Sequence, residues 1–297
     1  MFHVYAVSMG LYLAAYCAGT LVIVERYRPE TVLQLIGSQR ITSLAASPTI
    51  LIGLMAHADF ARTDFGSLRV CYSGSAALAE DTLRRWEAAT GCPVCEGYGQ
   101  SEAGPVLTYN PLRGLRKLRS VGIALPDTEV QIVDIETGLR VLPAREIGEI
   151  RARGPQVMTG YRHQPEQTAA ALRDGWLYTG DIGELDAQGY LYIRDRKKEM
   201  VIVAGFNVYP REVEEALFTH PAVVEAAVVG QPDDYRGEVL VAWVAVDDPA
   251  VTEPKLLDYL TQRLVRYKVP QAIRFLPSLP KTSVGKLDKN RLRQSRA

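Results

Sequence analysis

The sequence predicts a layered α/β fold followed by a smaller α+β domain. Helical and strand patterns alternate in the first part, short strands and turns dominate from Glu129, and both types recur after Met200. Alternation of this kind favours parallel strands covered by helices. A chain of 297 residues is long enough for two domains.

Proline and apolar spacing mark the elements of the first part. Pro29 is expected to begin a helix, because proline suits a first helical turn. Leu83 and Trp86 fall on one face of a further helix. The elements expected here are helices at 29–40, 48–57 and 79–90 and strands at 41–44 and 68–73.

The remaining elements predict a β-rich subdomain continuous with the first part, and then the small α+β domain. Short apolar runs between turn residues indicate strands, and Pro210 again opens a helix. The expected strands are 130–134, 149–152, 191–193, 200–204, 223–229, 239–246 and 273–276, with helices from 210 and at 254–266.

The segment Arg194–Glu199 consists of six charged residues between two apolar strands. We place a domain boundary there, with one domain over 1–195 and a C-terminal domain over 196–297. A charged surface turn and a hinge between domains both explain the segment.

Composition describes an ordinary globular protein, with 47% apolar and 23% charged residues. Equal numbers of basic and acidic residues, 34 each, give no electrostatic argument for nucleic acid or an acidic membrane as a partner. The end of the chain, 281–297, is locally basic. One interpretation is a solvated basic face. The other is a functional segment in which Lys286 is the only basic residue with a role.

The uncharged run Phe2–Val24 is long enough to cross a bilayer. A buried helix followed by a buried strand explains it better, because Gly10 and Gly19 divide it and it ends in β-branched residues. We therefore expect no integral membrane span.

Four cysteines include the pair Cys92 and Cys95 with CxxC spacing. A structural zinc site would need a second pair, and a redox motif would open a helix rather than a short apolar strand. Packed, reduced cysteines are the expected outcome, which suits a cytoplasmic location.

Two glycine-containing loops are candidates for ligand binding. Glycine in 73–76 lets backbone amides approach a ligand, although a plain strand-to-helix turn also explains this loop. In 97–102, Tyr98 can stack on adenine, while Ser101 and Glu102 place a hydroxyl and a carboxylate where Mg²⁺ could carry ATP phosphates. The loop lacks the third glycine of a dinucleotide fingerprint.

Five segments occur in a fixed order: EGYGQSE (96–102), WLYTGD (176–181), RDRKKE (194–199), AGFNVYP (204–210) and PKTSVGK (280–286). Together they resemble the adenylate-forming (AMP-binding) superfamily, most closely the fatty-acyl-CoA synthetases. The resemblance implies an ATP-dependent, AMP-forming acid–thiol ligase. A fatty acid would be the substrate, coenzyme A the thiol, and ATP, Mg²⁺ and coenzyme A the cofactors.

The resemblance also implies roles for individual residues. The carboxylate of Asp181 would accept hydrogen bonds from both ribose hydroxyls, and Arg196 would reach the same ribose. The full nucleotide-binding set is Ser73, Gly74, Ser75, Ala76, Gly97, Tyr98, Gly99, Gln100, Asp181 and Arg196. Lys198 matches the hinge position, while Gly205 and Asn207 would line the coenzyme A tunnel, with Ala204 where relatives have glycine.

The catalytic residues implied by the resemblance are Lys286, Glu102, Ser101 and His3, with Glu102 as the Mg²⁺ ligand. Lys286 would bridge the attacking carboxylate and the α-phosphate, lowering the repulsion between two anions. A P-loop reading of Gly285-Lys286 fails because Leu287 replaces serine or threonine. For His3, a packed histidine and a residue beside the carboxylate site are both open.

The resemblance further implies that the large domain is incomplete. Relatives carry a Ser/Thr/Gly-rich phosphate loop near the N-terminal third, and no such loop occurs here. A missing N-terminal portion would leave exposed apolar surface and sheet edges. Two other functions are therefore kept: an adenylation module that loads a carrier protein, and a catalytically incomplete fragment or nucleotide-binding remnant.

Overall fold

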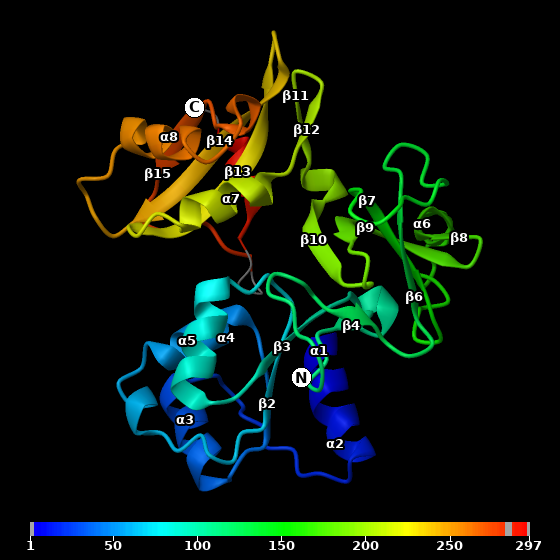
Figure 1. The fold of residues 1–297 in the computed structure, drawn as a ribbon, viewed down its shortest axis with the longest axis vertical. Helices are drawn as coiled ribbons and strands as arrows, with labels where there is room; N and C mark the ends of the chain where they lie inside the picture. The colour runs from blue at the N-terminus through cyan, green and yellow to red at the C-terminus, as the bar shows by residue number, and fades with distance from the viewer. Residues whose placement is uncertain (1–2, 283–286, 296–297) are drawn as a thin grey trace. The chain divides into compact units, whose positions relative to one another are not determined.

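The computed structural model describes residues 3–282 and 287–295. The chain divides into two compact units, one of Met1–Thr179 with Gly183–Ile193 and the other of Gly180–Ile182 with Arg194–Ala297. Figure 1 shows helices and sheets in both, so the α/β fold class is confirmed. The predicted boundary between residues 195 and 196 stays a prediction.

The first sheet of unit 1 begins with three parallel strands and ends with two antiparallel ones, in the order β1-β2-β3-β4-β5. Their bounds are β1 (Ser43–Ala46), β2 (Val70–Ser73), β3 (Val94–Tyr98), β4 (Thr108–Tyr109) and β5 (Ile123–Ala124). Ser73 pairs in register with Glu96. The carboxyl ends of β2 and β3 therefore lie side by side, at the edge where parallel sheets bind ligands.

Three helices pack with this sheet: α3 (Pro29–Ser38), α4 (Pro48–Met55) and α5 (Glu80–Thr90). Proline occupies the first turn of α3 and α4, and α5 ends at Gly91 with φ +67°. Trp86 is fully buried among the apolar side chains of all three helices. The predicted helices and the strand ending at Ser73 are confirmed, while β1 lies two residues later than expected.

Three of the four cysteines behave as packed apolar residues, whereas Cys17 is exposed. Cys71, Cys92 and Cys95 are buried, and all four cysteines are free. Burial raises the pKa of the Cys92 thiol to about 11, so the thiol stays protonated at neutral pH. A reactive CxxC pair is therefore not formed.

The expectation for the first apolar run was wrong in two respects. The helical part, α1 (Val4–Ala6), a π-helical segment (Val7–Tyr12) and α2 (Leu13–Tyr16), has no buried residue, and no strand forms over residues 18–25. Tyr12 is 65% and Tyr16 91% exposed. Apolar composition predicted burial, but burial also requires a neighbouring surface, and few side chains of this chain cover the segment.

The β-rich subdomain is confirmed as a second sheet, in which the order β10-β9-β7-β6 is extended by β8 beside β9. Its strands are β6 (Glu129–Val133), β7 (Gly148–Arg153), β8 (Leu172–Arg173), β9 (Trp176–Leu185) and β10 (Leu191–Arg196). Helix α6 (Pro165–Ala171) directly precedes β8.

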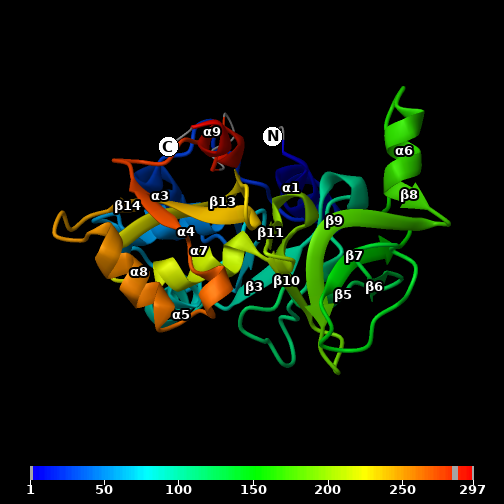
Figure 2. The ribbon, with the colours of Figure 1, turned by 90° about the horizontal axis from the view of Figure 1, so that it is seen from above.

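Unit 2 is built on a sheet of order β12-β11-β14-β13, with β15 parallel to β14. Its elements are β11 (Val201–Val203), β12 (Phe206–Val208), α7 (Pro210–Phe218), β13 (Val223–Asp233), β14 (Gly237–Val246), α8 (Glu253–Thr261), β15 (Ala272–Phe275) and α9 (Lys289–Gln294). Along β13, Val228 joins the core with α7 and α8, while Val229 joins the core with Leu292 of α9. Both faces of the sheet are therefore covered, as Figure 2 shows.

The basic end of the chain is more than a solvated face. Lys289 Nζ lies 2.7 Å from Glu214 Oε1, both side chains are under a fifth exposed, and Arg293 pairs with Glu199. These contacts fasten α9 to its own unit. Among the described residues, no helix has the length and apolarity that a membrane crossing requires.

Candidate active site

The loops that follow β2 and β3 form the candidate site in unit 1. The backbone N–H of Leu78 donates to Oε1 of Glu96, 3.1 Å away, and Glu96 is only 5% exposed. This buried carboxylate ties the turn after β2 to the neighbouring strand. The predicted segments 73–76 and 96–102 are thus brought together.

The turn after β2 passes from a buried residue to exposed ones. Ser73 is fully buried, whereas Ser75 and Ala76 are exposed, and Ser75 has a left-handed φ of +71°. A Cβ on Gly74 would lie 3.2 Å from the Tyr5 ring. The exposure of Ser75 and Ala76 suits contact with a ligand, but the Ser73 hydroxyl does not reach the surface.

The two glycines of the second loop are required by close packing. A Cβ on Gly97 would lie 2.3 Å from the Tyr109 ring, and a Cβ on Gly99 would lie 2.0 Å from the carbonyl oxygen of Pro105. Tyr98 lies between them and is partly buried. Glycine is therefore needed here for packing, whichever ligand the loop binds.

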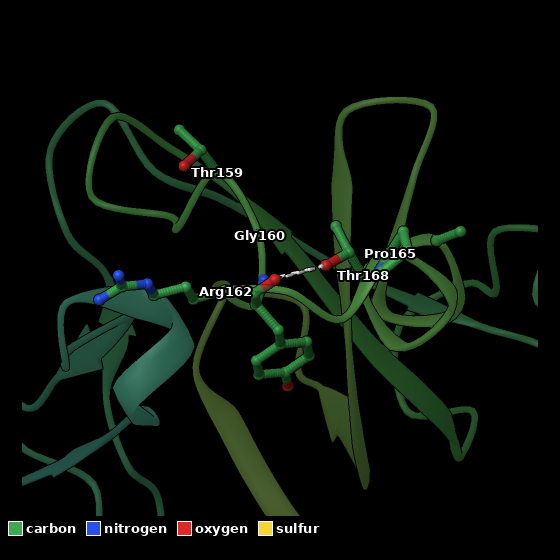
Figure 3. Close-up of a pocket in the computed structure, with 7 residues that line it drawn as sticks. Thr159, Gly160, Arg162, Pro165 and Thr168 are labelled. Atoms are coloured by element: carbon green, nitrogen blue, oxygen red, sulfur yellow. Dashed lines mark hydrogen bonds between the residues drawn. The ribbon is translucent and has the colours of Figure 1, made fainter.

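Glu102 lies in a short 3₁₀ turn, Ser101–Ala103, directly after this loop. The Tyr161 hydroxyl donates to Glu102 Oε1 over 2.8 Å, and Glu102 is partly exposed, as is Gln100, while Ser101 is exposed. Tyr161 also lines an open hollow of about 580 Å³ beside α6, drawn in Figure 3.

A carboxylate with one engaged oxygen suits Mg²⁺. This ion commonly takes one or two protein carboxylates and completes its shell with phosphate and water oxygens. Within residues 3–282 and 287–295, no cluster of three His, Cys, Asp or Glu side chains could hold a metal ion. The Glu102 carboxylate thus offers its second oxygen, Oε2, to a ligand.

The predicted ribose ligands come together in unit 2. Arg196 Nε lies 3.7 Å from Asp181 Oδ1, and the two residues lie on the neighbouring strands β10 and β9. The Asp181 side chain is 16% exposed and that of Arg196 is 55% exposed. An ion pair at this exposure leaves the guanidinium accessible to a ligand.

The remaining C-terminal candidates are exposed. Ala204 and Gly205, with φ +49° and +84°, form the two-residue turn between β11 and β12, and Asn207 follows on β12. Positive φ at both positions is the geometry of a type I′ hairpin turn. Lys198 is exposed in the 3₁₀ turn Lys197–Glu199.

Two of the predicted catalytic residues, His3 and Lys286, lie near the two ends of the sequence. His3 is exposed, and its Nδ1 accepts a hydrogen bond from the Tyr5 backbone N–H over 3.2 Å, so it caps the first helix. Lys286 lies outside the described residues. On either side of it, Lys281 pairs with Leu287, and the Asp288 N–H donates to the Pro280 carbonyl over 2.8 Å.

Sequence reasoning missed two residues of this region, Tyr109 and Tyr161. Tyr161 is 59 positions from its partner Glu102, and no motif links them. Tyr109 is recognisable only through the strand pairing that sets it opposite Gly97. Neither contact can be found from the sequence without knowledge of the three-dimensional fold.

Comparison with known proteins decides the family. The model of the AMP-binding enzyme family matches residues 1–162, and that of its C-terminal domain matches 212–286. The chain belongs to the AMP-binding enzyme family. This confirms the resemblance found in the sequence.

Individual members of the AMP-binding family give the scale of the match. The chain is 44% identical to a long-chain-fatty-acid–CoA ligase of Bacillus subtilis, over 98% of this chain and 52% of that protein. ATP-bound MatB from Rhodopseudomonas palustris superposes with a TM-score of 0.92 at 36% identity, over 99% of this chain and 58% of that one.

A third relative was solved with an intermediate bound. The o-succinylbenzoate CoA synthetase MenE of Bacillus subtilis, in complex with the acyl-adenylate OSB-AMP, superposes with a TM-score of 0.88 at 33% identity, over 99% of this chain and 59% of that one. The chain spans about half the length of the curated relatives it matches.

Proposed function

We propose that this chain carries the adenylate-binding part of an ATP-dependent, AMP-forming acid–thiol ligase, with a fatty acid as substrate and coenzyme A as thiol. The observation that carries the proposal is that the 73–76 and 96–102 segments meet at the carboxyl ends of adjacent parallel strands, with the Glu102 carboxylate at the end of the second segment. The fatty acid rests on the identity to long-chain-fatty-acid–CoA ligases.

The residues take the following roles in the proposal. Tyr98 stacks on adenine, the backbone of Gly74–Ala76 and Gly97–Gln100 lines the nucleotide, and Asp181 with Arg196 binds the ribose. Glu102 would hold Mg²⁺, which neutralises phosphate charge when bound. Ser101 supplies a hydroxyl beside Glu102, and His3 lies beside the carboxylate site.

The first chemical step joins the fatty acid to AMP. A carboxylate oxygen attacks the α-phosphorus of ATP, the bond to the β-phosphate oxygen breaks, and pyrophosphate leaves. The Lys286 ammonium stabilises the negative charge shared by the two reacting anions. Its effect should be confined to this step.

The second step transfers the acyl group. A thiolate attacks the carbonyl carbon of the acyl-AMP, a thioester forms, and AMP leaves with the bonding electron pair. Gly205 and Asn207 would face the incoming coenzyme A, and Lys198 would be the hinge at the boundary between 1–195 and 196–297. Four free cysteines support a reducing compartment such as the cytoplasm.

The two steps can be measured separately with the purified chain. Dodecanoyl-AMP with coenzyme A reports the second step, and dodecanoate with ATP and coenzyme A reports both, with the thioester detected by mass spectrometry. Lys286→Ala should abolish the full reaction and spare the second step, while the exposed Lys255→Ala should change neither. No thioester from dodecanoyl-AMP in folded wild-type chain would refute coenzyme A transfer. Thioester on a carrier protein alone would favour the loading module.

A further inference from the structure

Tyr161 makes a specific contact with the proposed cation ligand. Its hydroxyl donates to Oε1 of Glu102 over 2.8 Å, and no other hydrogen bond or ion pair to the Glu102 side chain occurs among the described residues. One carboxylate oxygen is therefore held, and Oε2 is left for another partner.

The backbone of residues 156–161, the segment that carries Tyr161, also contacts the Glu102 turn. The Met158 N–H donates to the Glu102 carbonyl oxygen over 2.8 Å. A Cβ on Gly104 would lie 2.9 Å from the Gln156 carbonyl oxygen, so the two backbones are in contact. The segment 156–161 thus fixes both the main chain and the side chain of Glu102.

Tyr161 is itself held at its backbone. Its N–H donates to the Thr168 hydroxyl over 2.9 Å, and that hydroxyl donates to the Gln164 carbonyl at the start of α6. Figure 3 shows Thr168 facing the backbone of Gly160, where a Cβ would come within 2.8 Å of Thr168. The phenol therefore projects from an anchored position.

We propose that Tyr161 is a positioning residue that orients the Glu102 carboxylate so that Oε2 meets the divalent cation brought by the nucleotide. The inference rests on the proposed function of this site and names a residue outside its ligand set. A glutamate side chain otherwise samples several rotamers, and cation binding would have to restrict them. Tyr161 restricts them in advance.

The test is a magnesium titration of nucleotide binding by the full chain. A fluorescent ATP analogue reports binding, and the readout is the Mg²⁺ concentration at half-maximal signal. Tyr161→Phe should raise this concentration roughly 10-fold, the effect of one hydrogen bond to a charged group. Its affinity for AMP without Mg²⁺ should stay unchanged. Tyr192→Phe is the matched control, because Tyr192 also donates a hydroxyl to a carboxylate, Asp186, over 3.4 Å in the same unit.

The outcomes separate the inference from the function on which it rests. An unchanged Mg²⁺ requirement in Tyr161→Phe overturns the positioning role while leaving the site intact. Equal losses of AMP and Mg²⁺-dependent binding, or the same shift in Tyr192→Phe, overturn it in favour of a general structural role. Wild-type chain that binds AMP but shows no Mg²⁺-dependent ATP binding refutes the cation site itself.

Discussion

Arg196 Nε lies 3.7 Å from Asp181 Oδ1, on two neighbouring strands of one sheet. The family resemblance implied that both residues reach the same ribose, and their pairing places a carboxylate acceptor beside a guanidinium donor. Such a pair can accept from a diol and donate to a ligand oxygen at the same time.

Asp181→Asn should weaken AMP binding roughly 10-fold, because an amide offers one acceptor oxygen where the carboxylate offers two. Isothermal titration with AMP measures the change. Asp234→Asn makes the same substitution at an exposed position of the same unit and should leave the affinity unaltered. Equal affinities for the Asp181→Asn and wild-type chains would remove Asp181 from the site.

Gly97→Ala should destabilise unit 1 by about 1–3 kcal/mol, because the new methyl group would overlap the Tyr109 ring. The double variant with Tyr109→Ser should recover part of that loss. Gly99→Ala should cost more, and no side-chain change should rescue it, because its neighbour is the Pro105 carbonyl. Urea unfolding measures all of these. Full stability of Gly97→Ala alone would contradict the packing argument.

The partly buried phenol of Tyr109 predicts a loss of stability at alkaline pH. Burial raises its pKa to about 12, against the opposing effect of its hydrogen bond with Tyr5. The unfolded value is about 10, so the stabilisation is complete below about pH 10 and is lost as pH rises toward the folded pKa.

Between about pH 10 and about pH 11, Tyr109 should cost the wild-type chain about 1 kcal/mol of unfolding free energy. The Tyr109→Phe chain should not show this part of the loss. Urea unfolding across this range checks it. Tyr235→Phe is the control, because it removes the same hydroxyl from a side chain that is 95% exposed. Identical slopes for Tyr109→Phe and wild type would mean that the phenol is not buried.

Ala204→Gly should stabilise unit 2 by about 1 kcal/mol. Ala204 has φ +49°, a left-handed conformation that costs residues with a Cβ about 1–2 kcal/mol and glycine almost nothing, and the greater freedom of glycine in the unfolded chain offsets part of the gain. Thermal unfolding of the wild-type and Ala204→Gly chains gives the difference in stability. A lower melting temperature for Ala204→Gly would show that the turn does not strain alanine.

Local signals predicted most elements, and long-range contacts account for what they missed. Proline at Pro29, Pro48 and Pro210 marked three helix starts, because the preference of proline for a first turn needs no tertiary partner. Tyr12 and Tyr16 were expected inside, yet apolar character alone does not supply a surface to cover them.

The candidate site divides in the same way. The glycines 97 and 99 could be recognised from sequence because backbone approach leaves a residue-type signature. The contacts of Glu96 with Leu78 and of Tyr161 with Glu102 could not, because they join positions that only strand pairing and loop packing bring together. Their roles follow from geometry rather than from residue type.

ATP–pyrophosphate exchange shows whether this chain forms an acyl-adenylate, because the exchange requires reversible formation of that intermediate. The purified chain would be assayed with a ladder of straight-chain fatty acids, beside Lys286→Ala. Exchange should require a fatty acid, peak at one chain length and disappear in Lys286→Ala. Folded protein that shows no exchange with any acid would contradict formation of an acyl-adenylate, and the chain would then be a binding piece whose chemistry needs more than these residues.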